Sequence, residues 1–135
     1  MTDRSPKTET GDSILIVDDT PDNLQLLSYL LSKEGYTVRV MASGSSALES
    51  VRAEPPDLIL LDIMMPGMSG YEVCQQLKAD QCTREIPVIF ISALNVIQDR
   101  VKAFDMGGVD YITKPFHSKD VLARVGINLD LLRTR

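Results

Sequence analysis

The chain has 135 residues, of which 44% are hydrophobic and 24% charged, an ordinary composition for one globular domain. The formal net charge of -5 argues against a nucleic-acid-binding surface, because such a surface needs clustered lysine and arginine. The longest apolar runs are only strand-length and no signal peptide is visible, so we expect no membrane span and a cytoplasmic location.

The opening residues are polar and lack periodicity, which predicts a mobile tail over residues 1–12. Most of the apolar stretches that follow are continuous, as in strands buried on both faces of a sheet. The second stretch instead alternates apolar and polar residues, which is typical of a strand nearer the edge. The predicted strands are 13–17, 36–40, 58–62, 86–91 and 109–113.

Between these strands, apolar residues recur at helical spacing and predict helices. Capping residues mark the starts, with a proline after Thr20 and a capping box from Ser69 to Glu72. We also expect Ser43 and Ser118 to cap helices, and the fourth helix to begin near Asn95. The apolar residues of that fourth helix are Val96, Ile97, Val101, Ala103 and Phe104.

Strand and helix alternate five times without a linker or a repeat. This pattern predicts an α/β fold in which a parallel sheet is covered by helices on both faces. The second strand is more polar than the first and third, so an edge position suits it, as in the doubly wound, flavodoxin-like order 2-1-3-4-5. We expect residues 13–132 to form this single domain, with 133–135 at its end.

Polar side chains stand where four of the predicted strands end. These residues are Asp18 and Asp19, Asp62, Ser92 and Lys114. The carboxyl ends of parallel strands point the same way, so we expect the five side chains to converge in one pocket. Three carboxylates and one ammonium leave two negative charges, which one divalent cation neutralises. Oxygen ligands select a hard ion, and Mg²⁺ is the usual choice beside a phosphate.

The motifs resemble a response-regulator receiver domain of a two-component system. The resemblance covers about residues 12–132, and its marks are 14–19, 62–66 with Gly70, 92–93 and 110–116. Each motif alone is common, but their order and their places at the strand ends are specific.

The resemblance implies a role for each matching residue. Asp62 matches the phosphoacceptor, and Lys114 matches the lysine that pairs with the phosphoryl group. Asp19 matches the residue that contacts Mg²⁺ directly, and Asp18 matches the one that acts largely through water. Met64 matches the position whose backbone carbonyl binds the metal, so its side-chain type does not matter there.

The resemblance also implies a conformational switch. Ser92 fills the Ser/Thr position and Tyr111 the switch aromatic, and the Lys114–Pro115 peptide matches a family cis bond. When Asp62 is phosphorylated, Ser92 is expected to move toward the phosphoryl oxygen while Tyr111 turns inward, as a population shift. His117, the only histidine, is expected to face solvent.

The function implied is a phosphorylation switch, not an enzyme beyond its own phosphorylation and dephosphorylation. A histidine kinase, a phosphotransfer protein or a small phosphodonor would supply the phosphoryl group. A phosphatase of the haloacid-dehalogenase type uses similar residues, but its two aspartates lie two apart after the first strand. A pure interaction module remains an alternative, although such receivers usually lack an acidic residue or the lysine. A flavin carrier is disfavoured, because Asp18 and Asp19 would repel the flavin phosphate.

The last predicted helix keeps its apolar spacing to Leu132 without a glycine or proline stop. We therefore expect it to continue as a linker to an output domain or kinase core, with fraying from Leu132 to Arg135 in this chain. The alternative is a homodimer through the fourth helix, fifth strand and fifth helix. Of the two cysteines, Cys74 falls among apolar helix positions and is expected to be buried.

Overall fold

The computed structural model describes residues 11–93 and 97–133. Within these residues, five parallel strands form one sheet in the order β2-β1-β3-β4-β5. The strands are β1 (Ser13–Val17), β2 (Thr37–Met41), β3 (Leu58–Asp62), β4 (Val88–Ser92) and β5 (Asp110–Thr113). The predicted fold class and strand order are confirmed.

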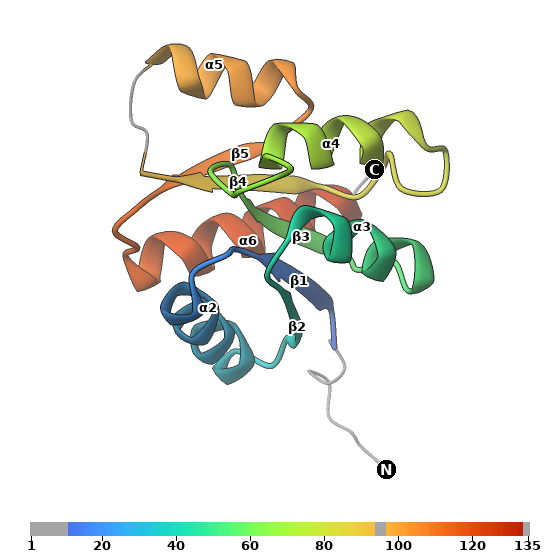
Figure 1. The fold of residues 1–135 in the computed structure, drawn as a ribbon. Helices are drawn as coiled ribbons and strands as arrows, with labels where there is room; N and C mark the ends of the chain where they lie inside the picture. Colours follow the sequence, from blue (N-terminus) through green and yellow to red (C-terminus); the bar gives the residue numbers. More distant parts are fainter. Residues whose placement is uncertain (1–10, 94–96, 134–135) are drawn as a thin grey trace.

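The helices cover both faces of the sheet (Figure 1). They are α2 (Pro21–Lys33), α3 (Gly44–Ala53), α4 (Gly70–Ala79), α5 (Ile97–Asp105) and α6 (Ser118–Arg133). On one face α3, α4 and α5 enclose a core that includes Val51, Leu77 and Ala103. On the other face α2 and α6 enclose a second core that includes Leu27 and Val125. Both faces of the sheet are thus shielded from water, as continuous apolar strands require.

The burial of each strand follows its sequence pattern. Every residue of β3 and β4 is buried, and so are the last four residues of β1. No residue of β2 is fully buried, and β2 lies at the edge beside β1. The alternation in its sequence therefore indicated its place correctly.

Three of the strands differ from the predictions at one or both ends, by one or two residues. β2 spans Thr37–Met41 rather than 36–40, and β5 begins at Asp110 rather than Val109. β4 begins at Val88 rather than at residue 86, and it ends at Ser92, where a polar strand end was expected. Pro87 precedes β4 and has no N–H to donate to a neighbouring strand, which is consistent with the later start.

The predicted caps are confirmed in two helices. The side chain of Ser43 accepts a hydrogen bond from the N–H of Ser46, and Ser69 and Glu72 form the predicted capping box. Thr20 occupies the N-cap position of α2 without a side-chain hydrogen bond. The prediction for Ser118 was wrong, because α6 already includes Ser118 and the N–H of Val121 donates to the carbonyl of His117.

Some predictions concern parts of the chain that the structure leaves undescribed. The tail over residues 1–10, the helix start at Asn95, and residues 134–135 lie outside the described residues. Of the apolar residues on α5, Ala103 is buried, but Val101 and Phe104 are 52% and 53% exposed. The helical spacing at those two positions therefore did not indicate a core contact.

The start of α4 packs directly under the end of β3. A Cβ atom on Gly70 would lie 2.9 Å from the Cα of Ile63 and would also collide with the carbonyl oxygen of Asp62. Both obstacles are backbone atoms, so neither can move aside as a flexible side chain could. A glycine is therefore required where the helix passes beneath Asp62.

We predict that Gly70→Ala lowers the free energy of unfolding by about 1–3 kcal/mol, as overpacking typically does. Gly126→Ala is the matched control, because a Cβ on Gly126 in α6 has no atom within 4 Å. Alanine in a helix interior is favoured over glycine by about 0.5–1 kcal/mol, so this variant should be as stable as the native chain or more so. Urea denaturation measures both, and equal effects would contradict the packing argument.

Candidate functional site

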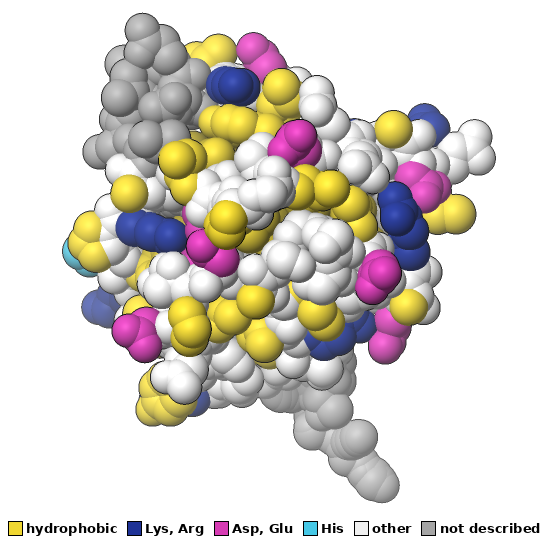
Figure 2. All heavy atoms as spheres, in the orientation of Figure 1, with side chains coloured by type: hydrophobic (Ala, Val, Ile, Leu, Met, Phe, Trp, Pro, Cys, Tyr) yellow, Lys and Arg dark blue, Asp and Glu magenta, His cyan; other side chains and the backbone are white. Residues whose placement is uncertain are grey.

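Charged side chains from the ends of three strands meet at one end of the sheet. Asp18 and Asp19 directly follow β1, and Asp62 ends β3. One carboxylate oxygen from each lies within 4.8 Å of the others. The Nζ atom of Lys114, which follows β5, lies 3.4 Å from Oδ2 of Asp18 and 3.5 Å from Oδ2 of Asp62. Figure 2 shows acidic side chains beside a basic one where β1 leads into α2.

Asp18 is completely buried and is held by several donors. Its Oδ1 accepts a hydrogen bond of 2.9 Å from the N–H of Thr20, and its Oδ2 accepts one of 3.2 Å from the side chain of Asn23. The ion pair with Lys114 adds a charge. Asp18 is thus fixed in place, whereas the neighbouring Asp19 is exposed to solvent.

Asp62 is 1% exposed, and its environment raises its pKa to about 6 from an ordinary value of 3.8. The largest cause is burial, which disfavours the charged form, and the second is the nearby carboxylate of Asp18. The Lys114 ammonium and the N–H of Met64, which donates to Oδ1 of Asp62 at 3.3 Å, act in the opposite direction. Further positive charge near Asp62 would therefore stabilise its ionised form.

The donor atoms at this site fit a hard cation. The three clustered carboxylates offer only oxygen, and one ammonium leaves two of their three negative charges uncompensated. Oxygen ligands and excess negative charge are what Mg²⁺ requires, and its usual sites keep several waters. Met64 lies two positions after Asp62 in the sequence. It is 62% exposed, so its thioether side chain does not fill the core.

Ser92 and Lys114 are joined through the backbone at the neighbouring strand ends. Ser92 ends β4 and is completely buried. The N–H of Lys114 donates to the carbonyl of Ser92 at 2.9 Å. The Lys114–Pro115 peptide is cis, as the resemblance implied. This arrangement places the hydroxyl-bearing residue and the ammonium-bearing residue on adjacent strand ends.

The ring of Tyr111 is turned inward in this structure. Tyr111 is 3% exposed and lies in the core beside Phe90, its register partner on β4. Because side chains alternate along a strand, Phe90 and Ser92 share the face that Tyr111 occupies. The structure thus presents the inward position of the expected switch aromatic. His117 is exposed, as expected.

A comparison with protein families shows to which family the chain belongs. The sequence profile of the response regulator receiver domain matches residues 14–126. The chain belongs to this family. The matched range contains the whole strand-end cluster, from Asp18 to Lys114.

Relatives and solved structures agree with this assignment. The transcriptional regulator RpaA from Synechocystis is 44% identical over 83% of this chain, and the match covers 46% of RpaA. The response regulator PleD from Caulobacter vibrioides is 45% identical over 83% of this chain and 25% of PleD. The receiver domain of a histidine kinase from Syntrophus aciditrophicus superposes with a TM-score of 0.81 at 34% identity, covering 88% of this chain and 90% of that one. A Francisella receiver domain gives 0.83 at 28% identity, covering 92% and 99%.

The chain therefore spans less than half the length of these two sequence relatives. This chain is a receiver domain of the kind that two-component response regulators carry. Within the residues that the structure describes, none of the helices has the length and apolar character needed to cross a bilayer.

The sequence named the four charged residues that meet at the strand ends, and Ser92 beside them, but it missed their supporting contacts. Asn23 reaches Asp18 from the first turn of α2, and an asparagine in a polar helix start carries no signal of that contact. Gly70 was noted as part of the motif after the third strand, but its close approach to Asp62 follows from the packing of α4, which the sequence does not specify. Cys74 is buried as predicted, and burial raises the pKa of its thiol to about 11.

The raised pKa of Asp62 predicts a pH-dependent stability. Between about pH 4 and pH 6 the folded receiver keeps a proton on Asp62 that the unfolded chain has lost, so its free energy of unfolding falls as pH rises through this window. One pKa unit corresponds to about 1.4 kcal/mol, which sets an upper limit of about 3 kcal/mol for the loss.

Other carboxylates titrate in the same range, so the matched comparison is with Asp62→Asn, whose amide does not titrate. Urea denaturation in the presence of EDTA should show the native chain losing stability relative to this variant between pH 4 and pH 7. A difference that does not change with pH would show that burial does not perturb Asp62.

Proposed function

We propose that Asp62 is the phosphoacceptor of this receiver. The observation that carries the proposal is the position of its carboxylate, which is buried and lies 3.5 Å from the Lys114 ammonium within a cluster of acidic oxygens. An oxygen of ionised Asp62 attacks the phosphorus of a donor, and the bond from phosphorus to the donor's leaving atom breaks. The product is an acyl phosphate on Asp62, and its hydrolysis restores the carboxylate.

The neighbouring residues have distinct roles in this reaction. Asp18, Asp19, Asp62 and the backbone carbonyl of Met64 would hold Mg²⁺, which supplies the positive charge that the cluster lacks. Lys114 already lies between Asp18 and Asp62, where its ammonium pairs with an incoming phosphoryl oxygen. The hydroxyl of Ser92 donates a hydrogen bond to another such oxygen.

Phosphorylation then controls a partner by shifting the positions of Ser92 and Tyr111. The donor is a histidine kinase, a phosphotransfer protein or a small phosphodonor in the cytoplasm. The receiver acts on an attached output or kinase domain, or on a second copy of itself. In the dimer, α5, β5 and α6 form the contact face, where Val101 and Phe104 are more than half exposed.

The direct test is to incubate the chain with Mg²⁺ and a small acyl phosphate and to measure its intact mass. We expect one added phosphoryl group that hydroxylamine removes, because hydroxylamine cleaves acyl phosphates. The same preparation should not turn over a phosphate monoester, which a phosphatase would hydrolyse. Failure to form an adduct with any donor, including a phosphorylated histidine kinase, would favour a pure interaction module.

A further inference from the structure

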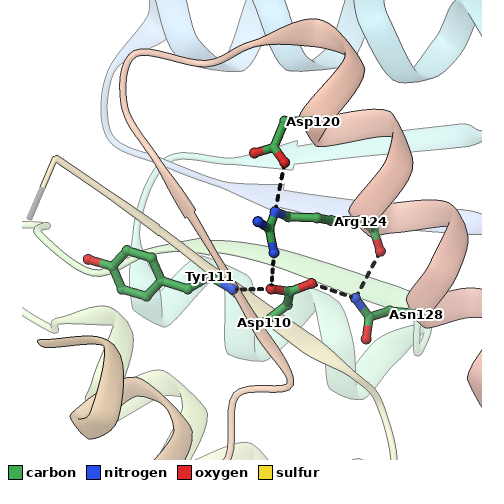
Figure 3. A network of polar contacts seen from close by, with 5 residues as sticks. All are labelled: Asp110, Tyr111, Asp120, Arg124 and Asn128. Carbon is green, nitrogen blue, oxygen red and sulfur yellow. Dashed lines mark hydrogen bonds and ion pairs between the residues drawn. The ribbon is translucent and has the colours of Figure 1, made fainter. Parts of the chain in front are cut away.

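The backbone of β5 is anchored to α6 on the side opposite the Tyr111 ring (Figure 3). The carboxylate of Asp110 accepts a hydrogen bond of 2.6 Å from Arg124 and one of 3.1 Å from Asn128. Arg124 is itself held by Asp120 at 2.9 Å. The N–H of Tyr111 donates to the same Asp110 carboxylate at 2.8 Å. This network holds the main chain at Tyr111, so a change of ring position must come mainly from side-chain rotation.

The ring of Tyr111 lies on the other face of β5, between the sheet and α5. There it belongs to the core that includes Phe90 and Ala103. The guanidinium carbon of Arg100, on α5, lies 5.2 Å from the centroid of the Tyr111 ring. A cation over an aromatic face is attracted by the negative charge of that face, and the long side chain also covers the ring. Arg100 thus contacts the ring in the inward position that this structure shows.

A second cation on α5 makes a similar contact with a different ring. The Nζ atom of Lys102 lies 4.7 Å from the centroid of the Tyr71 ring on α4. Tyr71 in turn packs edge-on against Phe90, with ring centroids 5.4 Å apart. Lys102 has the same charge as Arg100 and lies on the same helix, but its aromatic partner is not Tyr111. The two residues thus form a natural pair for comparison.

We propose that Arg100 is a positioning residue for Tyr111 and stabilises the inward ring. The outward ring loses the guanidinium contact, so Arg100 raises the inward-to-outward ratio whether or not Asp62 is phosphorylated. A cation–π contact of about 1 kcal/mol corresponds to a change of about fivefold in this ratio. This inference rests on the proposed role of Tyr111 as the switch residue, and it assigns α5 a part in setting the switch.

The test measures the exposure of the Tyr111 ring in four proteins: the native chain, Arg100→Gln, Arg100→Lys and Lys102→Gln. Each is labelled with 3-fluorotyrosine, and the Tyr111→Phe variant assigns one of the four tyrosine signals to Tyr111. A soluble gadolinium chelate broadens the fluorine signal of an exposed ring. We expect Arg100→Gln to increase the outward population of Tyr111 about fivefold. Arg100→Lys should increase it less, because lysine keeps the positive charge. Lys102→Gln should expose Tyr71 and leave Tyr111 unchanged.

Unchanged Tyr111 exposure in Arg100→Gln would overturn the inference, and so would an equal change in Lys102→Gln, which would indicate a general effect of charge on α5. Melting curves establish that each variant is folded. If Arg100→Gln does not fold, the Tyr111 exposure in Arg100→Lys tests the inference instead. Phosphorylation of Asp62 is measured separately. If Asp62 accepts no phosphoryl group while the Arg100 result holds, the proposed function fails and the assignment of Arg100 stands.

Discussion

Replacing Asp62 with asparagine is expected to abolish phosphorylation by a small acyl phosphate, with at least about a 100-fold loss of rate. The amide oxygen carries no full negative charge, so it is a poor nucleophile toward phosphorus and cannot form a stable acyl phosphate. Asparagine has nearly the same shape as aspartate but carries no charge. Burial disfavours the charged form of Asp62, which is why the pKa of Asp62 is raised. The variant should therefore fold at least as well as the native chain in the absence of Mg²⁺.

The matched control for this experiment is Asp22→Asn. Asp22 is an exposed acidic residue in the first turn of α2, near the site but outside the carboxylate cluster. This variant should be phosphorylated at the native rate. Intact-mass measurements follow both reactions, and peptide mapping locates the modified residue. Phosphorylation of Asp62→Asn at the native rate would show that another carboxylate is the phosphoacceptor.

The strand ends were predictable because local sequence and global topology agree there. In 58–62, four buried apolar residues lead to one carboxylate, and the loop that follows begins at once. A buried parallel strand has its neighbours on both sides, so its polar last residue must lie at the carboxyl edge with those of the other strands. The place of Asp62 next to Lys114 therefore follows from the order of the strands, although the two residues are far apart in the sequence.

The contacts around these residues were not predictable in the same way. The approach of Arg100 to Tyr111 depends on how α5 lies on the sheet, which no local pattern specifies. The exposure of Val101 and Phe104 has the same origin, because their helical spacing is compatible with several rotations of α5 about its axis. Periodicity identifies a helix and its apolar positions, but tertiary packing decides which of those positions are covered.

Replacing Asp19 with alanine is expected to remove the stabilisation of the receiver by Mg²⁺. An ion that binds only the folded state adds RT ln(1 + [Mg²⁺]/Kd) to the free energy of unfolding, or about 2.7 kcal/mol at a concentration 100 times Kd. Asp19 is the exposed member of the carboxylate cluster, whereas Asp18 is buried and held by Thr20, Asn23 and Lys114. Removing Asp19 therefore takes away a ligand and disturbs the fold little.

Melting curves with and without millimolar Mg²⁺ measure this effect, and Asp22→Ala serves as the control because it removes an exposed charge outside the cluster. Without Mg²⁺, Asp19→Ala should melt slightly above the native chain, since one of three mutually repelling carboxylates is gone. With Mg²⁺, the native chain and Asp22→Ala should both gain stability, and Asp19→Ala should not. A native Mg²⁺ shift that survives in Asp19→Ala would mean that the ion binds without this carboxylate, and a native chain that does not respond to Mg²⁺ would count against the metal site.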